Sequence, residues 1–153
     1  MSTVSIALFL HLIAAVVWIG GMFLAYMAVR PAVVEVLEPP QRLKLWAAIF
    51  RRFFPWVWAA VVVLLGSGFM MMGVMGKVPV YVVAMTIIGI VMTAIFLYIY
   101  FMPFGELRRA VAAEDWKAGG AALGTIRMLV GTNLILGLVN IAVAVFGRTI
   151  SLT

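Results

Sequence analysis

The 153-residue chain is 67% hydrophobic and only 10% charged, with a mean hydropathy of +1.23, whereas a soluble domain is expected to be about half apolar and a quarter charged. This composition excludes a water-soluble globular domain and predicts an integral membrane protein. The net charge is +6, which invites a nucleic-acid interpretation that the distribution of the charges does not support. The chain contains no cysteine, which excludes disulfide bonds and thiolate metal sites.

Four apolar stretches are each long enough to cross a bilayer, which takes roughly 20 mostly apolar residues. They cover residues 4–29, 53–75, 80–102 and 118–146, and the segments between them are too short to form another domain. We therefore predict an all-α fold in which residues 1–153 form a single integral membrane four-helix bundle.

The first helix contains the only histidine of the chain, His11, within the stretch FLHLIAAVVWIGG. At 100° per residue its face also carries Ala15, Trp18 and Met22, so small side chains next to the imidazole leave room for a flat ligand. His11 lies roughly 10 Å below the outer surface if the helix enters the membrane at Val4, and there the neutral form, which binds metals, is favoured. The alternative is a histidine that only hydrogen-bonds a neighbouring helix.

The loop after the first helix is interrupted by Glu38-Pro39-Pro40, because proline suits only the first turn of a helix. Apolar residues then recur at helical spacing over residues 41–52, with basic residues on the remaining surface. This pattern is typical of an amphipathic helix at the membrane interface. We expect it to end before Pro55 starts the second span.

Four methionines are expected at the same membrane level as His11, namely Met71, Met72 and Met75 at the end of the second helix and Met85 early in the third. Thioether sulfur selects soft metals such as Cu(I), and it also serves as an axial haem ligand beside histidine. The alternative is that these methionines only fill gaps between helices.

The fourth helix carries small and polar residues on two faces. Gly120, Gly124 and Gly131 form one stripe, and Asn133 and Asn140 lie almost opposite. Small-residue stripes let helices approach closely in lipid. We therefore expect one face inside the bundle and the other toward a second copy in a homodimer, while the glycine spacing suits packing within one chain equally well.

The basic residues are distributed unevenly between the two sides of the membrane. Lys77 and Arg148 lie on one side, and Arg127, within the fourth helix, is expected to reach the headgroups or to pair with Glu114 or Asp115. The two long loops carry the other eight: Arg30, Arg42, Lys44, Arg51, Arg52, Arg108, Arg109 and Lys117. The positive-inside rule then predicts a multi-pass protein of a bacterial inner (cytoplasmic) membrane, with both termini periplasmic. The lipid bilayer is its expected partner, and nucleic acid is not.

Two stretches resemble a known membrane family. HLIAAVVWIGG, followed by Arg30-Pro31, resembles the first helix of the CopD-type membrane domain, and RRFFPWVWAAVVVLLGSG resembles its second helix. The first helix is also similar to that of HemJ-type protoporphyrinogen oxidases, which are small membrane haem b proteins. The resemblance implies that His11 is a metal or haem ligand and that Trp18 and Gly21 shape its pocket.

Three hypotheses about function follow. In the first, the protein is a haem b redox protein with His11 as axial ligand, shared across a homodimer or paired within one chain, and with an electron donor or acceptor as partner. Its haem would contact Ala15, Trp18, Gly21 and Met22, with Tyr81, Asn140 and Arg148 available for polar contacts. In the second, the protein binds or transports copper through His11, Met71, Met72, Met75 and Met85. In the third, it is a non-catalytic membrane assembly protein. The sequence assigns no catalytic residue and leaves open whether the protein is an enzyme, which would then be an oxidoreductase.

Overall fold

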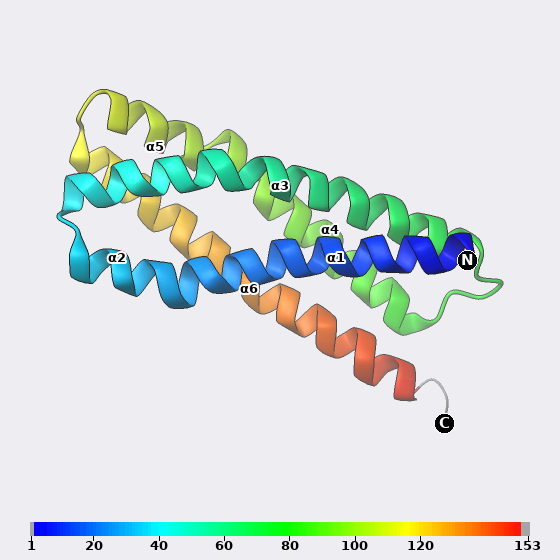
Figure 1. Ribbon diagram of the computed structural model, residues 1–153. Helices are drawn as coiled ribbons and strands as arrows, with labels where there is room; N and C mark the ends of the chain where they lie inside the picture. Colours follow the sequence, from blue (N-terminus) through cyan, green and yellow to red (C-terminus); the bar gives the residue numbers. More distant parts are fainter. Residues whose placement is uncertain (1, 151–153) are drawn as a thin grey trace.

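The computed structural model describes residues 2–150, in which four long helical segments form a bundle (Figure 1). Each segment is long and apolar enough to cross a membrane, and no strand occurs between residues 2 and 150. The predicted all-α, four-helix membrane fold is therefore confirmed, while residues 1 and 151–153 of the predicted unit lie outside the described part. The elements in chain order are α1 (Thr3–Leu24), the π-helical turn η1 (Ala25–Val29), α2 (Arg30–Val36), α3 (Pro39–Gly73), α4 (Val80–Phe101), α5 (Pro103–Ala112) and α6 (Trp116–Ile150).

The helix boundaries differ most from the prediction in α3. Residues 41–52, predicted as a separate interfacial helix, are continuous with the second span. The helix starts where the sequence suggests, since its first turn contains two prolines and the Glu38 backbone N–H donates to Gln41 Oε1 at 3.4 Å. Pro55 lies inside α3 and is exposed, so the carbonyl that loses its helical partner is accessible to water or lipid headgroups and the helix continues.

The helical segments are longer than a bilayer is thick. Each has 33 to 35 residues, or about 50 Å at 1.5 Å per residue, against roughly 30 Å of hydrocarbon. The start of α1 and the ends of α3 and α6 lie at one end of the bundle, here named the terminal end (Figure 1). The opposite end, named the loop end, contains α2, α5 and the first turns of α3 and α6. At least one end therefore extends beyond the hydrocarbon.

An aromatic cluster joins α3, α4 and α5. The rings of Phe50 and Phe54 stack with centroids 5.1 Å apart, and Phe54 also meets Phe104 at 4.9 Å and Phe96 at 5.6 Å, both edge to face. All four are buried. These contacts explain the four-residue spacing of Phe50 and Phe54, which places both rings on one face of α3. The two rings hold α5 against the bundle after the break at Met102.

Candidate functional site

The only histidine lies at the contact between α1 and α3. His11 Nδ1 is 2.8 Å from the Oγ of Ser67, and a Cβ placed on Gly68 would lie 3.5 Å from His11 Cε1. The glycine therefore lets the imidazole lie directly against α3. Ser67 is buried and His11 is half-buried, so the imidazole stays partly accessible from outside the helix pair.

The hydrogen bonds of Ser67 determine which nitrogen of His11 carries the proton. The Ser67 Oγ also lies within hydrogen-bonding distance of the Val63 carbonyl oxygen, and 3.3 Å from that of Leu64. A carbonyl only accepts, and a hydroxyl has one proton, so Ser67 donates to the backbone and accepts from His11 Nδ1–H. The neutral imidazole then keeps a free lone pair on Nε2, the arrangement found in metal-ligating histidines.

The alternative that His11 hydrogen-bonds a neighbouring helix agrees with this contact, which involves Nδ1. Ser67 was not predicted. The available signal was the sequence LLGSG, in which one hydroxyl stands between two glycines about 56 residues from the histidine.

The rest of the His11 face is packed into the core. Trp18 and Met22 are buried at 4% and 3% exposure, and Ala15 is half-buried. The Trp18 ring meets Phe96 edge to face with centroids 6.2 Å apart. Any Cβ on Gly21 would collide with the ring of Phe53. The space beside Gly21, which the resemblance implies is part of a ligand pocket, is therefore filled by an aromatic side chain of α3.

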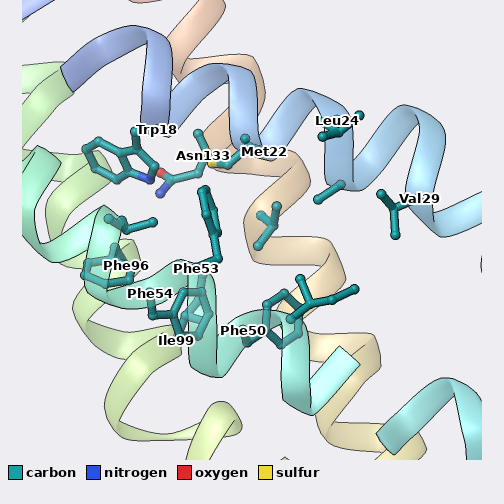
Figure 2. A pocket seen from close by; sticks show the side chains of 15 residues that line it. Trp18, Met22, Leu24, Val29, Phe50, Phe53, Phe54, Phe96, Ile99 and Asn133 are labelled. Carbon is teal, nitrogen blue, oxygen red and sulfur yellow. The ribbon is translucent and has the colours of Figure 1, made fainter. Parts of the chain in front are cut away.

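A cavity of about 230 Å³ lies next to Trp18, between residues of α1, α3, α4 and α6 (Figure 2). Its lining is apolar except for Trp18 and Asn133, and His11 is not part of it. Asn133 donates from Nδ2 to the Met92 carbonyl at 3.0 Å, while its buried Oδ1 has no partner within residues 2–150. Pockets for drug-sized ligands measure roughly 300–1,000 Å³, so this cavity is smaller than such a pocket.

The polar residues predicted to contact a haem have no recorded contact with His11 within residues 2–150. Tyr81 packs against Gly147, where an added Cβ would collide with it, and Arg148 is exposed near the end of α6. Asn140 is half-buried, and its Oδ1 has no partner in the described part of the chain. No hydrogen bond or ring contact links these three residues to His11 between residues 2 and 150.

The methionines divide into two groups. Met71 is half-buried and follows Ser67 by one turn on the same face of α3. Met72 instead faces α4, where its sulfur lies 3.4 Å from Thr86 Oγ1. Met85, also half-buried, precedes Thr86, and Met75 lies exposed beyond the end of α3. Of the four methionines, Met71 is thus the one that shares the α3 face of Ser67.

Charged ligands are absent from this region. No group of three or more His, Cys, Asp or Glu residues that could hold a metal ion occurs between residues 2 and 150. The five carboxylates of the chain all belong to α2, α5 and the connections at the loop end: Glu35, Glu38, Glu106, Glu114 and Asp115. Any metal bound near His11 would be held by neutral nitrogen and sulfur donors.

The glycine stripe of α6 does not form one uniform surface. Tyr26 of η1 covers Gly131, so closely that an added Cβ would lie 2.9 Å from its ring. Gly120 and Gly124 have open space beside them. The stripe therefore serves packing within the chain at Gly131, and the homodimer stays a prediction.

The family model of copper resistance protein D matches residues 47–146, nearly two thirds of the chain. The chain belongs to this family. No curated protein and no solved structure matches it. The matched region includes Ser67 and the four methionines and begins after His11. Membership indicates a multi-pass membrane protein related to copper resistance, whereas nothing in the comparisons supports haem binding, and the similarity to HemJ-type oxidases stays a prediction.

Proposed function

We propose that the protein binds Cu(I) within the membrane through His11 Nε2 and passes it on as part of copper handling. The observation that carries the proposal is the pair of hydrogen bonds at Ser67, which favour the His11 tautomer with its proton on Nδ1 and a lone pair on Nε2. Membership of the copper resistance protein D family supports copper over haem.

The donors near His11 suit a soft monovalent ion. Imidazole nitrogen and thioether sulfur bind Cu(I), whereas hard divalent ions prefer carboxylates, which lie at the other end of the bundle. A single positive charge also costs less to bury among neutral ligands than a double charge. Met71 is the proposed second donor because it shares the Ser67 face of α3.

A site with few ligands is suited to transfer rather than storage. Conduction requires binding that is favourable enough for the ion to enter and weak enough for it to leave. Further sulfur atoms are present at the terminal end. Met75 is exposed beyond α3, and Met72 of α3 and Met85 of α4 are half-buried. We propose that copper approaches His11 from this end, which is the periplasmic face in the predicted orientation.

Competition with a chromogenic Cu(I) chelator, under anaerobic reducing conditions, tests the proposal on the detergent-purified chain. We expect one Cu(I) per chain, lost in His11→Ala and bound roughly tenfold or more weakly in Met71→Leu, since one donor is removed at each position. Met128→Leu is the matched control, because Met128 is 64% exposed on α6. Unchanged Cu(I) binding in His11→Ala, with the variant still folded, contradicts the proposal.

The same preparation also tests the haem hypothesis, which includes an electron donor or acceptor as partner. An absorption spectrum with a Soret band that disappears in His11→Ala would favour haem and contradict the copper proposal. We expect no such band, because Phe53 occupies the space beside Gly21 and His11 does not line the nearby cavity.

A further inference from the structure

Three arginines from different elements line a second cavity, of about 250 Å³, at the loop end of the bundle. Arg30 begins α2, Arg42 lies in the first turn of α3, and Arg127 belongs to α6. Arg127 is far from the other two in sequence, and the three line one cavity because α2, α3 and α6 converge. No carboxylate lines this cavity, and within residues 2–150 none of the three arginines forms an ion pair.

Two of the three guanidinium groups are held in place. Arg42 donates to the carbonyl oxygens of Val34, at 2.9 Å, and Leu37. The guanidinium carbon of Arg30 lies 5.1 Å from the centre of the Tyr26 ring, a contact that leaves the donors at its edge available. Arg127 is exposed and makes no hydrogen bond in the described part of the chain. The cavity therefore offers unused N–H donors.

The concentration of positive charge indicates an anionic ligand. Like charges brought together repel each other, and a bound anion offsets that repulsion. Arginine forks pair with phosphate through two parallel hydrogen bonds, and a phosphate has enough oxygen atoms for more than one such fork. A phosphate group is thus the chemical class that this site fits best.

The remaining lining indicates a lipid rather than a soluble phosphate. Trp46, Leu123 and Val130 provide apolar walls, and Gly124 opens the α6 side, since nothing lies within 4 Å of an added Cβ. Arg127 is 23 residues from the end of α6, or about 35 Å along its axis. If the hydrocarbon begins at the terminal end, this distance places Arg127 at the far headgroup level, because the hydrocarbon is roughly 30 Å thick.

We propose that this cavity binds the phosphate of an anionic glycerophospholipid, with an acyl chain along the apolar walls. Such a lipid would join α2, α3 and α6 at the loop end. The site is independent of the copper proposal, because it lies at the opposite end from Ser67 and His11 and uses none of the same residues.

Lipid binding is measured on the delipidated full chain in detergent, by native mass spectrometry and thermal unfolding. The probes are dioleoylphosphatidylglycerol, dioleoylphosphatidylcholine and inorganic phosphate. We expect phosphatidylglycerol to bind at least tenfold more tightly than phosphatidylcholine and to raise the unfolding temperature. Arg127→Gln should lose about tenfold in affinity, as expected for one charge-assisted contact, and Gly124→Leu should narrow the cavity, since an added Cβ there meets no atom within 4 Å.

Matched variants separate a defined site from diffuse attraction. Arg51→Gln removes an exposed cation of α3 outside the cavity, and Gly20→Leu fills open space elsewhere, so both should bind phosphatidylglycerol like the unaltered chain. An equal loss in Arg51→Gln and Arg127→Gln overturns the proposal, as does equal affinity for the two lipids. Equal stabilisation by inorganic phosphate overturns the lipid assignment. A change of oligomeric state in Gly124→Leu with unaltered lipid affinity would instead assign the glycines to a second copy.

Discussion

At the scale of single residues, Ser67 gives His11 its chemical character. Its hydroxyl donates to the α3 backbone and accepts from Nδ1–H, so one side chain determines both the orientation and the tautomer of the imidazole. Outer-shell partners of this kind typically change metal affinity by 10–100-fold. We therefore expect Ser67→Ala to bind Cu(I) roughly tenfold or more weakly while remaining folded.

The measurement is the chelator competition described above, together with the ¹⁵N spectrum of histidine-labelled protein, which contains a single imidazole because His11 is the only histidine. The proton is expected on Nδ1 in the unaltered chain and on either nitrogen in Ser67→Ala. Thr93→Val is the control, since Thr93 Oγ1 also donates to a helix carbonyl, that of Gly89, away from the site. A proton on Nε2 in the unaltered chain would contradict this prediction.

The two residues also show what the sequence reveals about the site. His11 could be singled out because an imidazole in an uncharged apolar helix is conspicuous. Ser67 could not, because a hydroxyl that donates to its own helix backbone is common in membrane helices, and its partner depends on the register between α1 and α3. That register is set by side-chain packing, such as Phe53 against Gly21, which periodicity alone does not determine.

At the scale of helices, Phe54 is the residue that joins α3 to α4 and α5. It is 4% exposed and its ring contacts those of Phe50, Phe96 and Phe104. Since helices in lipid associate largely through packing, removing this ring leaves a void that three elements share. We expect Phe54→Ala to lower the free energy of unfolding by about 3 kcal/mol, measured by denaturant unfolding in detergent.

The matched control is Trp56→Ala, which removes a larger aromatic side chain that is 66% exposed and should change stability little. Equal destabilisation by both substitutions would contradict the role assigned to Phe54. The same cluster explains why residues 41–52 are not a separate helix: Trp46 and Phe50 stack at 5.2 Å and continue the Phe54 face along α3. The sequence pattern correctly predicts which face of residues 41–52 is apolar. That this helix continues past Pro55 into the second span depends on packing against α5.

At the scale of the whole molecule, the orientation decides from which side copper reaches His11. Eight of the basic residues lie in α2, α5 and the loop-end parts of α3 and α6, and the positive-inside rule predicts that this end faces the cytoplasm. The chain has no native cysteine, so single cysteines can be labelled without background. We expect a membrane-impermeant maleimide to label Lys77→Cys in intact cells and Ala113→Cys only after permeabilisation, since both positions are exposed at opposite ends of the bundle. The reverse pattern would place His11, eight residues from the start of α1 and so about 12 Å along its axis, nearer the cytoplasmic face, and copper would then have to approach from the cytoplasm.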